Sequence, residues 1–155
     1  MGTILAVCVS DKKGVPKREL PSVELRVGLG IVGDAHAGNW HRQLSLLARE
    51  SVDTMRGLGV ELPPGVFAEN LLTEGLDLKA LPVGTVLRAG TALLAVTQIG
   101  KECHSDCAIK QTVGRCVMPT EGIFAIVLKA GVIKPGDPIE IEALEIGIYR
   151  DNAPP

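Results

Sequence analysis

The chain has 155 residues, of which 46% are hydrophobic, and it carries a net charge of -2 at neutral pH. This length suits one domain with a sizeable core. The balanced charge offers no basic surface for nucleic acid, and the apolar run at the N-terminus is too short for a membrane span or a signal sequence. Without a secretion signal, we expect a cytoplasmic protein whose thiols stay reduced.

The N-terminal third predicts strands followed by a helix. Residues 3–10 (TILAVCVS) are rich in β-forming residues and alternate loosely, so they predict a strand. The polar sequence at 11–14 favours a turn, and a second strand is expected over residues 23–28. Residues 46–59 give the best helix prediction, because their apolar residues fall roughly on one helical face and glycines follow.

The C-terminal half predicts paired strands. Residues 85–98 read as two strands joined at Ala89-Gly90. Residues 122–144 give two more, with the Lys-Pro-Gly-Asp sequence at 134–137 as the turn between them.

The end of the chain and the strand count together define the expected architecture. Residues 145–150 form a possible last strand, and the tail at 151–155 is expected to be disordered, so that residues 1–150 make a single domain. Many short strands with few helices indicate a mainly β fold, a closed or nearly closed β-barrel with a few short helices. A β-sandwich is the alternative that periodicity does not exclude.

Residues 30–48 (GIVGDAHAGNWHRQLSLLA) contain a loop dense in glycine and polar residues. Glycines let the backbone approach a ligand closely, and Arg42 could bind a phosphate with its planar guanidinium. Asp34, His36 and His41 accompany it, although the five-residue step between the histidines suits a zinc pair poorly. A glycine-rich turn with solvated side chains is the plain alternative.

Glu69 and Asn70 lie at the expected entry to a strand, between apolar residues. A carboxylate and an amide in this position can hold a neighbouring loop through hydrogen bonds to its backbone. We therefore predict a structural role for both.

Three of the four cysteines, Cys103, Cys107 and Cys116, fall within residues 100–119. Their C-x3-C-x8-C spacing departs from the common zinc-site spacings. A metal site, buried inert cysteines and a reactive thiol all remain open. Cys8, in an apolar strand, is expected in the core.

The reactive-thiol alternative rests on nearby cations. Lys101 and Arg115 flank the cysteine cluster, and His104 adjoins Cys103. Such charges can lower a thiol pKa and yield a usable thiolate. The segment could also carry a short helix from Cys103 or Ser105 onward.

Four stretches taken together resemble the MOSC domain, named for the C-terminal domain of molybdenum cofactor sulfurases. They are GIVGDAHAGNWHRQLSLLARES, GVFAENLLTEGLDLKALPVGTVLRAG, VTQIGKECHSDC and GIFAIVLKAGVIKPGD. They occur in the family's order and cover about residues 20–142. The resemblance implies a β-barrel with a few short helices.

The resemblance also implies a chemistry for Cys103, which stands where the family has its cysteine, although Glu102 replaces the proline that precedes it in many members. That cysteine is thought to carry sulfur as a persulfide or to ligate molybdenum, and both suit a thiolate. Cys107 could then resolve the persulfide. The implied cofactor is the molybdenum cofactor (molybdopterin), with a tungsten form as a variant.

The implied partners follow from the absence of an aminotransferase-like desulfurase part in this sequence. A separate cysteine desulfurase would supply the sulfur, giving a sulfurtransferase-like activity, and molybdenum or tungsten enzymes or cofactor-biosynthesis proteins would receive it. The implied cofactor-binding residues are expected in one pocket near Cys103, with Arg42 and Lys101 at the pterin phosphate. They are Asp34, His36, His41, Arg42, Gln43, Glu69, Asn70, Lys101 and Arg115.

Two other functions stay open. One is a molybdopterin-binding carrier module that performs no chemistry. The other is a zinc-stabilised scaffold that uses Cys103, Cys107 and Cys116.

Overall fold

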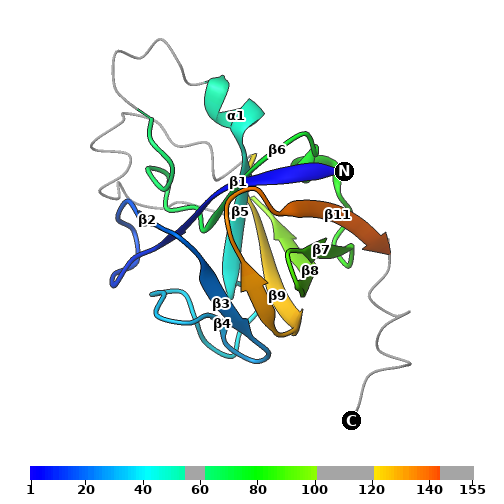
Figure 1. Cartoon of the computed structure of the whole chain (residues 1–155), viewed down its shortest axis with the longest axis horizontal. Coiled ribbons are helices and arrows are strands. Elements are labelled where there is room, and N and C mark those ends of the chain that lie inside the picture. Colours follow the sequence, from blue (N-terminus) through cyan, green and yellow to red (C-terminus); the bar gives the residue numbers. More distant parts are fainter. Residues whose placement is uncertain (55–61, 101–120, 144–155) are drawn as a thin grey trace.

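The computed structural model describes residues 1–54, 62–100 and 121–143 (Figure 1). Strands dominate these residues. In chain order the elements are β1 (Gly2–Val9), β2 (Arg18–Leu20), β3 (Val23–Arg26), β4 (Gly30–Ile31), β5 (Leu44–Ala48), α1 (Arg49–Asp53), β6 (Leu71–Glu74), the 3-10 turn η1 (Leu78–Ala80), β7 (Val86–Ala89), β8 (Ala92–Ile99), β9 (Ile123–Lys129), β10 (Gly131–Ile133) and β11 (Pro138–Ala143).

Seven strands close into a barrel. Their order around it is β1-β11-β7-β8-β9-β5-β6, and β6 returns to β1. All neighbours are antiparallel except β5 and β6, which are parallel, and β2 extends the sheet beyond β1. Closure leaves these seven strands without an unpaired edge. The barrel prediction is therefore confirmed and the sandwich alternative is wrong.

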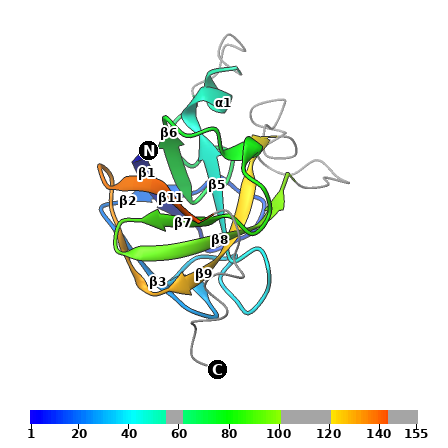
Figure 2. The same ribbon diagram turned by 90° about the vertical axis from the view of Figure 1, so that its right-hand side faces the viewer.

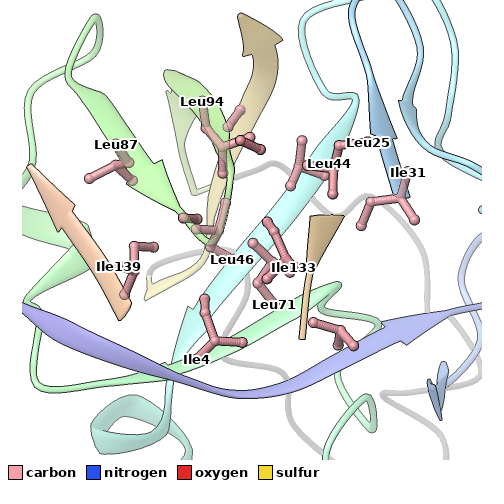
Figure 3. Packing of buried hydrophobic residues seen from close by; sticks show 14 of the residues in the cluster. Ile4, Leu25, Ile31, Leu44, Leu46, Leu71, Leu87, Leu94, Ile133 and Ile139 are labelled. Carbon is pink, nitrogen blue, oxygen red and sulfur yellow. The ribbon is translucent and has the colours of Figure 1, made fainter. Parts of the chain in front are cut away.

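Aliphatic side chains fill the barrel interior. Along β5, Leu44, Leu46 and Ala48 point inward and join the main core, whereas Leu47 points outward into a second buried cluster with Phe67. Figure 3 shows leucine and isoleucine side chains from several strands converging inside the barrel. Because the chain is only 3% aromatic, this narrow interior is filled by branched aliphatic residues, as is common in small barrels.

A register shift in β1 sends its side chains to two cores. Strict alternation from Ile4 would bury Ala6 and Cys8 beside it. The pairing of β1 with β6 shifts between Ile4 and Ala6. As a result Ile4, Val7 and Val9 face the barrel interior, while Ala6 and Cys8 join the outer cluster.

The helix predicted over residues 46–59 is wrong in its first part. Leu46–Ala48 belong to β5, and the helix comprises only Arg49–Asp53; residues 55–61 lie outside the described part of the chain. All five residues of β5 are buried, because the inward face meets the barrel core and the outward face meets the second cluster. A strand buried on both faces shows no polar alternation, so its apolar run imitates a helix.

Residues 122–144 form three strands rather than the predicted two. After β9 the chain leaves the barrel as β10, which pairs with β3 in a small sheet of order β10-β3-β4. The predicted turn is confirmed: Asp137 N–H donates to Lys134 O at 3.1 Å, and Gly136 has φ +94. Figures 1 and 2 show the β3–β4 hairpin and α1 at opposite ends of the barrel.

The remaining strand predictions agree with the structure. Residues 3–10 correspond to β1, residues 23–28 contain β3, and residues 85–98 form the β7–β8 hairpin with its turn after Ala89. The possible strand at 145–150, the tail and the helix in the cysteine segment lie outside the described residues. Within the described ranges, no helix is long and apolar enough to cross a membrane.

Candidate functional site

The loop between β4 and β5 carries the polar side chains singled out in the sequence, and its end meets the end of β8. Thr97 Oγ1 donates to His41 O, and His41 Nε2 lies 2.8 Å from Gln98 Oε1. Gln98 Nε2 in turn donates to Gly100 O at 2.8 Å. These contacts join the loop to the strand from which the chain continues toward Cys103, which itself lies outside the described residues.

Arg42 packs against two aromatic rings. Its guanidinium carbon lies 4.8 Å from the centroid of Trp40 and 5.5 Å from that of Phe124. The Lys13 ammonium also lies over Trp40, at 4.5 Å. We call Lys13, Trp40, Arg42 and Phe124 the Arg42 cluster. Arginine over aromatic faces is favoured by cation–π attraction, and this packing fixes the plane of the guanidinium.

The Nε atom of Arg42 is buried and has no hydrogen-bond partner among the described residues. A buried donor without an acceptor costs about 1–3 kcal/mol. An acceptor oxygen from a ligand would recover that cost, and a guanidinium binds carboxylate or phosphate oxygens best. The Arg42 cluster therefore has the chemistry of an anion site.

A second group of polar residues lies behind His36. The Lys17 ammonium donates to Asp34 Oδ1 at 2.8 Å, and the side chains of both residues are fully buried. Lys17 Nζ also lies 3.0 Å from Ser10 Oγ and 3.1 Å from His36 Nδ1. We call Ser10, Lys17, Asp34 and His36 the Lys17 network. It ties the β1–β2 loop to the β4–β5 loop.

Asp34 is ionised within this network. Burial by itself would raise its pKa, but the hydrogen bond from Lys17, the charge of Lys17 and the Ser10 N–H lower that pKa well below its usual range. The other carboxylate oxygen, Oδ2, accepts the His36 backbone N–H at 3.0 Å. Asp34 thus fixes the backbone on which His36 and Trp40 stand, and its oxygens face the protein.

Gln43 and Asn70 are also engaged by the backbone. Gln43 is buried and its Oε1 accepts the N–H of Val127 in β9, at 2.9 Å. Asn70 Oδ1 accepts the Ser45 N–H at 2.9 Å, and its Nδ2 donates to Cys8 O at 2.9 Å. Both residues cross-link strands and loops of the barrel wall.

Glu69 clamps the loop that precedes β6. Its two carboxylate oxygens accept the N–H groups of Gly65 and Phe67, at 2.9 and 3.1 Å. Between them and Glu69 lies Ala68, whose φ of +63 is unusual for a residue other than glycine. The clamp holds this strained turn, so the predicted structural roles of Glu69 and Asn70 are confirmed.

Burial raises the pKa of Glu69 from 4.5 to about 7, against the lowering effect of the backbone N–H groups and Lys17. The folded pKa exceeds the unfolded one, so the contribution of Glu69 is fully present below about pH 4.5 and is lost as the pH rises toward 7. This difference between the folded and unfolded pKa of Glu69 corresponds to about 3 kcal/mol of unfolding free energy.

We therefore expect Glu69→Gln to change how stability depends on pH. The variant loses one N–H acceptor at every pH, but its free energy of unfolding no longer falls between about pH 4.5 and 7 as it does in the wild type. Urea unfolding at several pH values measures this. Parallel curves for the two proteins over that range would contradict the assignment.

Cys8 is confirmed as a core residue. It is fully buried in β1, and burial, together with Glu69 and Glu19 and against the opposing effect of Lys17, raises the pKa of its thiol to about 12. The thiol is therefore neutral and unreactive. Residues 1–54, 62–100 and 121–143 contain no group of three or more metal-binding side chains.

The structure thus separates the predicted site residues into two groups. His36, His41 and Arg42 come together around Trp40 at the surface of the β4–β5 loop, and Asp34 supports them from beneath. Gln43, Glu69 and Asn70 bind backbone inside the protein. The predicted Cys103, Cys107, Lys101 and Arg115 lie outside the described residues.

Sequence reasoning missed two residues of this region. Trp40 is the only tryptophan of the chain, and a single large aromatic inside a polar loop was the signal that could have found it. Lys17 gives no such signal, because in sequence it is one of several lysines near a predicted turn. Only burial distinguishes it from Lys12 and Lys13.

Comparisons with known proteins found a matching family model and solved structures of similar fold. A model of the MOSC domain matches residues 33–140. YuaD from Bacillus subtilis superposes with a TM-score of 0.75 at 21% identity, covering 92% of this chain and 97% of that one. YiiM from Geobacillus stearothermophilus gives 0.69 at 24%, covering 96% and 82%, and YiiM from Escherichia coli gives 0.67 at 21%, covering 99% and 79%. No curated protein matches the sequence.

The described residues thus form a closed barrel of seven strands, with a polar loop packed against the end of β8. The chain belongs to the MOSC domain family, since that family's model matches residues 33–140 of its 155. Membership is consistent with a role related to the molybdenum cofactor.

Proposed function

We propose that this protein binds the molybdenum cofactor, in its molybdenum or tungsten form, and carries sulfur for it as a persulfide on Cys103. The observation that supports the proposal most is the Arg42 cluster: a fixed guanidinium with an unpaired buried N–H, next to the end of β8. The strand β8 leads within four residues of its end to Cys103.

The residues of the Arg42 cluster fit the anionic part of such a cofactor. Arg42 and Lys13 supply two positive charges around one indole ring. A phosphate monoester is a preferred partner of arginine, which can donate two hydrogen bonds to it. Bound in this way, the cofactor would supply a metal that accepts a thiolate, and ligation of that metal is the alternative role of Cys103 to carrying sulfur.

Cys103 is near this loop by sequence. Cys103 lies three positions after Gly100, and a fully extended chain over three such steps spans about 11 Å. Gly100 itself is anchored, since its N–H donates to Gly122 O at 2.7 Å and its carbonyl accepts from Gln98. Cys103 can therefore act near Arg42, as proposed, because only a short segment separates it from the anchored Gly100.

Sulfur loading is a thiol exchange without net oxidation. The Cys103 thiolate attacks the terminal sulfur of a persulfide on a cysteine desulfurase. A sulfur–sulfur bond forms on Cys103 while the donor's sulfur–sulfur bond breaks, and the donor leaves as a thiolate. The outer sulfur of the Cys103 persulfide is then delivered to molybdenum or tungsten enzymes or to cofactor-biosynthesis proteins. Cys107 is a candidate resolving thiol. Lys101 and Arg115 are proposed to favour the Cys103 thiolate.

We expect Arg42→Ala to weaken binding of molybdenum cofactor released from a molybdenum enzyme by about tenfold or more, because it removes a charge-assisted contact. Arg26→Ala is the matched control, since Arg26 is an exposed arginine paired with Glu24; it should bind as the wild type does. Native mass spectrometry measures the bound fraction. Equal binding by wild type and Arg42→Ala would contradict the anion site.

The same samples test sulfur loading. After incubation with cysteine and a cysteine desulfurase, the wild type should gain the mass of one sulfur under both native and denaturing conditions, removable by reductant, and Cys103→Ser should not. Loss of cofactor retention in Cys103→Ser, with no persulfide ever forming on the wild type, would instead favour the carrier module. A collapse of the fold in Cys103→Ser would favour the zinc scaffold, because structural zinc contributes directly to folding.

A further inference from the structure

We infer that Lys17 holds His36 in one neutral tautomer, so that the Nε2–H of His36 is a fixed hydrogen-bond donor to an acceptor oxygen of the ligand at the Arg42 cluster. The inference rests on the proposed function only for the nature of the ligand. It makes His36 a binding residue and Lys17, which no ligand can reach, a positioning residue.

The first step concerns the surroundings of the Lys17 ammonium. Its side chain is fully buried, and three atoms lie within hydrogen-bond distance of Nζ: Ser10 Oγ at 3.0 Å, Asp34 Oδ1 at 2.8 Å and His36 Nδ1 at 3.1 Å. An ammonium has three N–H donors and no acceptor. Three donors thus meet three partners, and each partner must accept.

The second step assigns the protons of the partners. Ser10 Oγ can accept because its own hydrogen is donated to Lys12 O, at 2.8 Å. Asp34 Oδ1 accepts as part of an ionised carboxylate. His36 Nδ1 must then be unprotonated, and a neutral imidazole with a bare Nδ1 carries its proton on Nε2.

A competing arrangement would place the proton on Nδ1 and direct it at Asp34. The separation of Nδ1 from Asp34 Oδ2 is 3.7 Å, too long for a hydrogen bond. That oxygen already accepts the backbone N–H of His36 at 3.0 Å. A proton on Nδ1 would also point toward the Lys17 ammonium, which is 3.1 Å away. The buried geometry therefore favours the Nε2–H form.

The third step concerns the side of His36 that faces outward. Its Nδ1 faces two fully buried groups, so the 19% of its side chain that is exposed lies on the rest of the ring. No described residue accepts a hydrogen bond from Nε2. The ring is parallel to that of Trp40 at a centroid distance of 6.5 Å, and Trp40 Nε1 donates to His36 O at 2.7 Å. Trp40 is thus shared by His36 and Arg42.

Together these contacts set a donor pattern around one indole ring. Arg42 offers a charged donor and His36 a neutral, directed one. A ligand that presents acceptor oxygens, from a phosphate ester or a ring carbonyl, matches these donors, whereas an amino group facing His36 would place one donor against another. The pair therefore selects for acceptors at this position.

The decisive measurement is the protonation state of the His36 ring nitrogens in ¹⁵N-labelled protein, by long-range ¹H–¹⁵N correlation. The chain has three histidines, and loss of one set of signals in His36→Gln assigns the residue. We expect Nδ1 unprotonated and Nε2 protonated at neutral pH. A protonated Nδ1 would overturn the inference, whether or not any variant of Lys17 folds.

Inorganic phosphate is the probe for the donor role. Titration should shift the His36 Nε2 resonance, and His36→Phe should bind phosphate at least fivefold more weakly, while His36→Gln, which keeps an N–H at the end of its side chain, stays within about threefold of the wild type. Arg26→Ala is again the control. No shift, together with wild-type binding by His36→Phe, would overturn the donor role.

Lys17→Met tests the positioning role by a readout that stability alone does not move. In folded variant protein, the His36 proton should distribute between Nδ1 and Nε2, because the donor that excluded it from Nδ1 is gone. An unchanged pure Nε2–H form would show that Lys17 does not set the tautomer. Failure of the proposed function is distinguishable, since it appears as normal cofactor binding by Arg42→Ala with the tautomer as expected.

Discussion

Gly65→Ala should destabilise the protein by about 3 kcal/mol or more, one of the largest losses expected from a single methyl group. Gly65 has φ +87, and a Cβ built on it would lie 2.1 Å from Lys17 O and 3.3 Å from Cys8 Sγ. The obstacle is backbone that is itself fixed, since Lys17 N–H donates to Gly65 O at 2.8 Å. An alanine must therefore displace the β1–β2 loop from the turn clamped by Glu69.

Gly33→Ala is a matched control for this result. Gly33 has the same φ of +87, but nothing lies within 4 Å of its hypothetical Cβ. The Gly33→Ala variant should therefore lose only about 1 kcal/mol of unfolding free energy, the cost of placing an alanine at a positive φ. Urea unfolding of both variants separates the backbone penalty from the steric one. Equal losses would show that the close approach of Gly65 to Lys17 is not a constraint on the fold.

Lys17→Met should cost about 3–5 kcal/mol, because it leaves the buried Asp34 carboxylate without its cation. The second variant, Lys17→Met with Asp34→Asn, removes the uncompensated charge and should recover part of this loss. Denaturant unfolding of both single variants and the double variant gives the coupling. A double variant that loses the sum of the two single losses would contradict a direct ion pair.

The contribution of Asp34 to the free energy of unfolding should change with pH in opposite directions in the wild type and in Lys17→Met. In the wild type the pKa of Asp34 is lowered in the folded state, so its contribution is present above the unfolded pKa of about 4 and is lost as the pH falls further. In Lys17→Met the remaining carboxyl is buried without a cation, which raises its pKa. Mild acid should therefore reduce the difference in free energy of unfolding between Lys17→Met and the wild type.

Buried polar residues explain why the candidate site could be located from sequence but not resolved into roles. The sequence showed that residues 30–48 hold a polar loop, and the structure confirms that His36, His41 and Arg42 belong to it. It did not show that Gln43 binds the backbone of β9, 84 residues away. The role of a side chain depends on which groups its polar atoms contact in the folded protein. Those contacts come from segments that are distant in the sequence.

The helix error has a related origin. The run Leu44–Ala48 is buried throughout, and a strand with both faces covered lacks the period-two pattern by which strands are recognised. Its two covers are the barrel interior and the cluster around Phe67. Neither can be inferred from the five residues themselves, so the apolar pattern was assigned to a helix.

By itself, the sequence determined the approximate place of β1, β3, β7, β8, β9 and β11 and of the turns at Gly90 and Gly136, through local periodicity and turn chemistry. The ordered motifs gave the resemblance that implied the barrel and the family. Tertiary structure alone decided that β5 is a strand, that Lys17 is buried, and that Trp40 contacts both Arg42 and His36. Each of these depends on desolvation, and desolvation is a property of the segments packed around a residue. The residue's own identity does not contain it.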